Sequence, residues 1–149
     1  MAGLSNTHEL ALLEWLFKRT AFPSVPTALH YSLHSADPGD TGASELASTA
    51  GYVRAQLDAD TNNSTNTNYN AAGTSGTTQV ISNKLDITFP TATGNWNSSS
   101  AIGYWGVWSA STSGTYYASG TITGGVVVLN TNTLKFAGGT PGSLTFDVD

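Results

Sequence analysis

An acidic stretch holds the residues whose types and spacing first suggest chemistry. The segment HSADPGDTGASEL, residues 34–46, carries the carboxylates of Asp37, Asp40 and Glu45. Such carboxylates could hold a divalent cation, but their spacing lacks the alternate acids and closing glutamate of an EF-hand loop. Asp followed by Pro and Gly fits a β-turn instead, because Asp caps its own backbone, Pro presets φ and Gly accepts positive φ. We therefore predict a structural turn and not a metal site.

The histidines do not form a recognisable site. His30 and His34 fall on what we predict to be the outer face of one strand, about 13 Å apart, which is too far for one metal ion. His8 lies on a predicted helix. The chain has no G-x-S-x-G nucleophile elbow and no phosphate-binding glycine loop. It has no cysteine, which excludes disulfides, thiolate catalysis and cysteine-ligated metals.

One further carboxylate pair, Asp58 and Asp60, borders a polar tract that water would solvate. Carboxylates in such a setting are ordinary surface charges more often than an acid–base pair. The sequence therefore predicts a protein that is not an enzyme and that has no catalytic residue, no cofactor and no metal.

Composition narrows the class of protein. The 149 residues predict one domain over 1–149, and only 10% of them are charged, against about 25% in a typical soluble domain. The net charge of -5 and five scattered basic residues argue against a nucleic-acid partner. We find no signal peptide and no apolar run of about 20 residues, so we expect synthesis in the cytoplasm and no membrane association.

An amphipathic helix is predicted over residues 5–20. Asn6 and Glu9 resemble a capping box, and Pro23 ends the segment. Five apolar side chains fall on one arc of roughly 160°, which we expect to pack on the chain's own strands. They are Leu10, Leu12, Leu13, Leu16 and Phe17.

Three residues are candidates for contact with another protein: Trp15, Leu12 and Tyr69. Trp15 falls on the polar side of the predicted helix, where it either lies against a loop of its own domain or meets another subunit. Tyr69 is the aromatic residue of the tract 58–78, which has almost no apolar bulk. We predict that this tract is a long polar loop, or an arm that a partner orders.

Beyond Pro23 the apolar period changes from 3.6 to 2. Leu29, Tyr31 and Leu33 alternate with polar residues, and several short strands follow at regular spacing, divided by Gly and Asn. SAIGYWGVWSA, residues 100–110, is aromatic on both faces and predicts a central strand. The fold class that we predict is mainly β: an antiparallel β-sandwich, jelly-roll-like, with one N-terminal amphipathic helix.

Several motifs occur in the order found in a known family. They are SADPG at 35–39, GASEL at 42–46, GYVR at 51–54, ITFPTATGNW at 87–96, AIGYWGVWSASTSGTYYASGTI at 101–122 and the closing LKFAGGTPGSLTFDVD. In this order they resemble the small virion structural proteins of tailed bacteriophages, some described as head decoration or cement proteins and others as tail-fibre proteins.

The resemblance implies a non-enzymatic virion protein made in the host cytoplasm. Our first interpretation is a capsid decoration protein that forms a homotrimer, binds the major capsid protein or another virion protein, and bridges capsomers. The alternative is a tail-fibre or baseplate-associated protein that could bind a host glycan. Trp96, Trp105 and Trp108 could stack on sugars, but their strand-like segments favour a place in the core.

Overall fold

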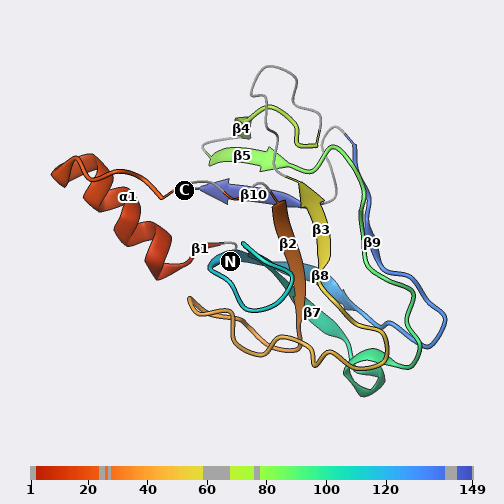
Figure 1. Cartoon of the computed structure of the whole chain (residues 1–149). Coiled ribbons are helices and arrows are strands. Elements are labelled where there is room, and N and C mark those ends of the chain that lie inside the picture. Colours follow the sequence, from red (N-terminus) through yellow and green to blue (C-terminus); the bar gives the residue numbers. More distant parts are fainter. Residues whose placement is uncertain are drawn as a thin grey trace.

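The computed structural model describes residues 3–23, 26, 28–58, 68–75, 78–139 and 144–148. Antiparallel strands dominate the fold and one α-helix precedes most of them, so the predicted fold class, mainly β with an N-terminal helix, is confirmed (Figure 1). The strands are β1 (Gly3–Leu4), β2 (Ala28–His34), β3 (Ala55–Asp58), β4 (Gly73–Ser75), β5 (Thr78–Ser82), β6 (Ile87–Thr88), β7 (Ile102–Trp108), β8 (Tyr116–Val126), β9 (Lys135–Phe136) and β10 (Thr145–Val148).

The helix α1 spans Asn6–Lys18, slightly shorter than the predicted 5–20. Its N-cap is Ser5 and not Asn6, and the Ser5 hydroxyl donates to the carbonyl of Tyr116 at 2.8 Å instead of capping the helix. At the other end Arg19 takes a left-handed conformation and its N–H bonds back to Glu14. Among the described residues no helix is both long and apolar enough to cross a membrane.

Five strands form the largest sheet, in the order β1-β8-β7-β2-β3, and every neighbouring pair is antiparallel. The predicted central strand is confirmed, because β7 lies in the middle of this sheet between β8 and β2. Its register with β2 pairs Trp105 with Leu33 and Trp108 with His30.

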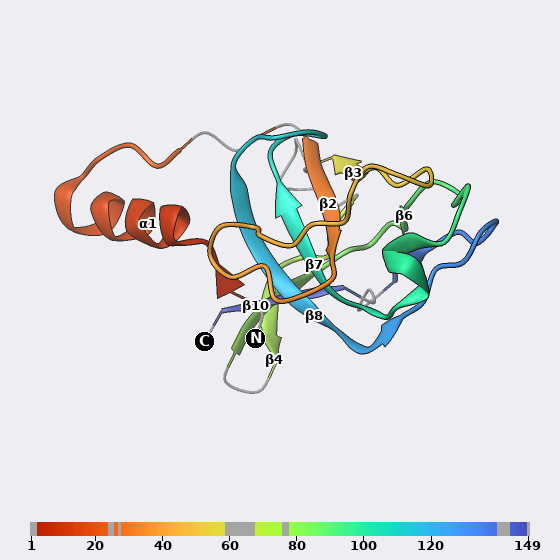
Figure 2. The same cartoon turned by 90° about the horizontal axis from the view of Figure 1, so that it is seen from below.

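Two smaller antiparallel sheets complete the structure, one ordered β10-β5-β4 and the other formed by β6 and β9. The apolar core joins β2, with Tyr31, and β3 and β7 of the large sheet to residues of the small sheets and loops, including Ile87, Phe89 and Phe136. This arrangement of the sheets is consistent with the predicted β-sandwich (Figures 1 and 2).

The polar tract 58–78 contains more secondary structure than predicted. Tyr69 forms an isolated antiparallel bridge with Asn83, and Gly73–Ser75 pairs with β5 as an edge strand. Residues 59–67 and 76–77, on which the prediction of a polar loop or arm also rests, lie outside the described residues.

The close packing of β7 on β8 yields a test of the core. A Cβ on Gly120 would overlap the Trp105 ring, which is buried in the core. Gly120→Ala should therefore lower the free energy of unfolding by about 1–3 kcal/mol, because the ring has nowhere to move. Urea denaturation of the purified protein measures the change.

Gly103→Ala is the matched control, because Gly103 lies in the neighbouring strand and a Cβ there meets no atom within 4 Å. This variant should lose no stability. Equal stability of the two variants would show that the ring of Trp105 is not held against β8.

Candidate functional site

The acidic segment forms the predicted turn. Gly39 N–H donates to Asp37 Oδ1 at 2.9 Å, and Ala43 N–H donates to the carbonyl of Pro38 at 2.9 Å. Gly39 and Gly42 both have positive φ, which glycine adopts without steric cost. These hydrogen bonds confirm the predicted turn. Asp37 and Asp40 are exposed at its surface.

The third carboxylate of that segment, Glu45, is held by Arg54. Arg54 Nε donates to Glu45 Oε1 at 2.8 Å, and Nη2 donates to Oε2 at 2.6 Å. Two parallel bonds of this kind combine charge with fixed geometry. The Tyr52 hydroxyl also donates to Glu45 Oε1, at 3.3 Å, and itself accepts a bond from Leu33 N–H at 2.9 Å. Glu45 therefore serves a structural ion pair.

Arg54 also fixes a second loop. Its Nη1 donates to the carbonyls of Ala110 and Ser113, each at 2.8 Å, and its guanidinium lies 3.9 Å from the ring centre of Trp108. The Arg54 side chain is only 6% exposed and that of Glu45 23%. A desolvated cation needs these partners, so its position determines where both loops lie.

A second polar network lies under the turn. His34 Nδ1–H donates to the carbonyl of Ala43 at 2.6 Å, which leaves Nε2 to accept the Ser32 hydroxyl proton at 2.7 Å. The Ser32 oxygen in turn accepts from Trp108 Nε1 at 2.8 Å. Burial lowers the pKa of His34; the hydrogen bond to the Ala43 carbonyl and the Glu45 charge offset that shift only in part, and the Arg54 charge adds to it. The imidazole is therefore held neutral.

These contacts correct our placement of the histidines. We expected His30 and His34 on a solvent-facing side of their strand, but both are buried. At His34 the turn after β2 covers that side of the sheet, because the His34 ring bonds the carbonyl of Ala43. His8, on α1, packs against Tyr117, with 4.4 Å between ring centroids and the rings tilted by 58°. Within the described residues, no group of three or more His, Asp or Glu side chains is placed to bind a metal ion.

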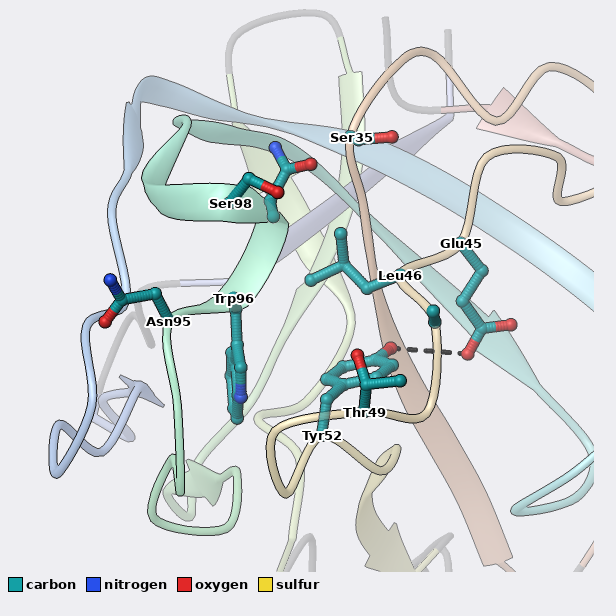
Figure 3. A pocket seen from close by; sticks show the side chains of 10 residues that line it. Ser35, Glu45, Leu46, Thr49, Tyr52, Asn95, Trp96 and Ser98 are labelled. Atoms are coloured by element: carbon teal, nitrogen blue, oxygen red, sulfur yellow. Dashed lines mark hydrogen bonds between the residues drawn. The ribbon is translucent and has the colours of Figure 1, made fainter.

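One surface hollow adjoins the ion pair, with a volume of about 250 Å³. On one side lie Asn95, Trp96 and Ser98; Figure 3 shows Leu46 and Tyr52 facing them from the loop after β2. Among the ten described residues that line it, Glu45 is the carboxylate, and Arg54 already neutralises it. The hollow therefore contains no pair of carboxylates for acid–base chemistry.

The rim of this hollow has an unusual backbone. Asn97, Ser98 and Ser99 have φ values of 49°, 51° and 65°, a short left-handed turn that costs roughly 1–2 kcal/mol per residue. Hydrogen bonds offset that cost: Asn95 Nδ2 donates to Ser99 Oγ at 2.9 Å, and Trp96 Nε1 donates to the carbonyl of Ala50 at 2.9 Å. The sequence gives little warning of this turn, since none of these residues is glycine.

The three candidate contact residues lie in two different environments. Trp15 and Leu12 are on α1 and are 50% and 42% exposed, so both are accessible at the surface. Tyr69 is only 8% exposed, and its hydroxyl hydrogen-bonds the Tyr31 hydroxyl at 2.7 Å inside the chain's own core. Tyr69 is therefore not exposed for contact with another protein, because its ring is buried in the core of its own chain.

The tryptophans also divide into two groups. Trp96, Trp105 and Trp108 are 2%, 4% and 9% exposed, which confirms the expectation that they belong to the core. Trp15 touches Phe22 edge to face, with 6.3 Å between ring centroids, and otherwise faces outward.

The protein is therefore mainly antiparallel β, and the ion pair of Glu45 with Arg54 links the loop after β2 to the loop between β7 and β8. A family model described as Podophage GP4 fiber I protein gp80 matches residues 3–144. The match covers nearly the whole chain, so the chain belongs to this family, and its resemblance to small tailed-phage virion structural proteins is confirmed. Comparison with the curated proteins gives no match.

The Arg54 cluster can be tested by keeping its charge and changing its shape. Arg54→Lys retains a cation but cannot reproduce the two-pronged bond to Glu45 together with both carbonyl bonds. We expect a loss of about 1–3 kcal/mol in the free energy of unfolding, measured by urea denaturation. Lys18→Gln, which breaks an exposed pair with Glu14, should change it by less than about 0.5 kcal/mol. Similar small losses in both would contradict the structural role of Arg54.

The neutral His34 imidazole predicts how stability depends on pH. Its folded-state pKa is lowered from the ordinary 6.5, so the unfolded chain binds the proton more readily. The contribution of His34 is complete above pH 6.5 and is lost as the pH falls through its folded-state pKa. Denaturation from pH 8 to pH 5 should show this decline, and His34→Gln should flatten it. An NMR titration that gives His34 a pKa at or above 6.5 would refute the assignment.

Proposed function

We propose that this chain is a structural component of a fibre on a podophage virion. The observation that carries the proposal is the family match over residues 3–144, whose description is that of a fibre protein. The described structure supports it, because the polar cluster of Glu45 with Arg54 holds loops in place and Arg54 neutralises the Glu45 carboxylate.

Capsid decoration, our first interpretation from the sequence, becomes the second candidate. It has the support of a surface poor in charge, since only 10% of residues are charged and neutral polar surface is easier to desolvate at a contact. The family description supports the fibre reading better. Both readings place the chain in the virion, and they differ in what it touches there.

A purely structural role, without catalysis, is part of the proposal. The Glu45 carboxylate is neutralised by Arg54, and His34 is fully buried with both ring nitrogens engaged. Binding of a host glycan gains no support from Trp96, Trp105 or Trp108, because rings buried in the core offer no face on which a sugar can stack.

Self-assembly, as the homotrimer expected from the resemblance, and docking on the major capsid protein or another virion protein also remain proposals. Many weak contacts repeated around a particle would give an attachment that one contact could not. These proposed contacts require the chain to be part of the virion.

Locating the chain on intact particles tests the proposal. Gold-labelled antibody against the purified chain should decorate fibres, and a density map of the particle should place the fold of Figure 1 there. Particles produced without the chain should keep a capsid of normal heat stability, because a fibre subunit does not bridge capsomers.

Label spread evenly over the shell, together with early thermal rupture of particles lacking the chain, would overturn the fibre assignment and establish the decoration role. Purified chain added back to such particles is the control, since it should restore either the fibres or the heat stability.

A further inference from the structure

The helix α1 presents an apolar surface that the described part of its own chain leaves exposed. We expected the arc of leucines to pack on the strands, but the structure leaves it in solvent, with Phe17 76% and Leu16 60% exposed. The other large apolar side chains exposed on or beside the helix are Leu10, Leu12, Leu13, Trp15 and Phe22. Exposed apolar surface of this extent marks an interaction site.

Among the described residues, the contacts that attach the helix to the sheets lie near its first turn. Ser5 and His8 join it to β8: Ser5 N–H donates to the carbonyl of Tyr117 at 2.8 Å, and the His8 ring packs against the Tyr117 ring. From there α1 extends away from the sheets, as both views show (Figures 1 and 2). Its 13 residues reach about 20 Å, so a second helix can lie alongside it without meeting the sheets.

Charge favours a second copy of this chain as the occupant. The charged residues of the helix and its cap, Glu9, Glu14, Lys18 and Arg19, cancel to zero, whereas the whole chain carries -5. Two copies can therefore meet along α1 without repulsion. A helix that binds an acidic membrane surface carries an excess of Lys and Arg on its polar face, which α1 lacks.

The size of the surface also suits self-association. From the exposed fractions, the seven side chains offer roughly 500–600 Å² of apolar surface per copy. Two such faces together reach about 1,000–1,200 Å², near the lower end of specific protein interfaces. The arc of roughly 160°, widened by Trp15, is broader than one narrow helix seam requires and leaves room for a third helix.

We propose that α1 packs against α1 of a second copy of this chain, with Leu13 and Phe17 both inside the contact. Leu12 and Trp15 lie along its edge, where Trp15 already meets Phe22. The helices would then join the chains while the sheets face outward. This inference rests on the surface of the chain and not on its place in the particle, so its failure leaves the fibre assignment standing.

Sedimentation of the full-length chain over a range of concentrations tests the proposal. The wild-type chain should be oligomeric at about 100 µM, a level at which even a weak specific contact forms. Leu13→Gln combined with Phe17→Gln should weaken association at least 30-fold, because glutamine keeps helix propensity but removes the apolar contact. Circular dichroism and thermal melting should show that the variant remains folded, since both side chains are exposed.

Leu129→Gln is the matched control: Leu129 is an exposed leucine outside α1, 44% accessible, and its replacement should change association less than threefold. A monomeric wild-type chain would overturn the proposal, and so would a double variant that still assembles. A monomer that floats with phosphatidylglycerol vesicles would identify lipid as the occupant and would equally overturn it.

Tryptophan fluorescence supplies an independent measurement. The other three tryptophans are buried, so quenching by acrylamide reports mainly on Trp15. Quenching should fall as the wild-type chain is concentrated and assembles, and should stay high in the double variant. Quenching that does not change on assembly would place Trp15 and its face of α1 outside the contact and overturn the proposal.

Discussion

The need to satisfy one nearly buried cation, Arg54, organises this structure. Its guanidinium gathers Glu45 from the loop after β2 and two carbonyls from the loop between β7 and β8, and it rests on the Trp108 ring. With the loop after β2 held there, its turn covers the outer side of the large sheet. That cover allows His34 and Ser32 to lie in the interior with every hydrogen bond made. The motifs GASEL and GYVR thus supply the two partners of one ion pair, Glu45 and Arg54.

Local patterns identified the N-terminal helix and the strands β2 and β7. Alternation of apolar residues places Tyr31 and Leu33 in the core side of β2, and aromatic residues on both faces identify β7 as a central strand. The Asp-Pro-Gly order gives the turn, because its chemistry is complete within a few residues. In a chain with so few charges, Glu45 and Arg54 on either side of Gly51-Tyr52 were a usable signal of a pair, and sequence reasoning missed it.

What lies against each face could not be read from the sequence. Periodicity separates two faces of a strand but does not say that a distant turn will cover the polar one, so His34 was placed wrongly in solvent. The same limit applies to α1, where an apolar arc predicts a buried face whichever molecule buries it. Tyr69 shows the converse: a polar tract carries one anchor into the core, and only the tertiary bond to Tyr31 reveals this.

The attachment of α1 has a consequence for how the chain is made. The Ser5 hydroxyl finds its partner, the carbonyl of Tyr116, 111 residues further along the chain. At 5–20 residues per second a ribosome needs roughly 6–22 s to synthesise that interval. Throughout this time the first segment has no sheet edge to join, and its leucines stand exposed on the nascent chain. Early encounters between neighbouring nascent chains, or a chaperone that holds the first twenty residues, therefore bear directly on the yield of folded protein.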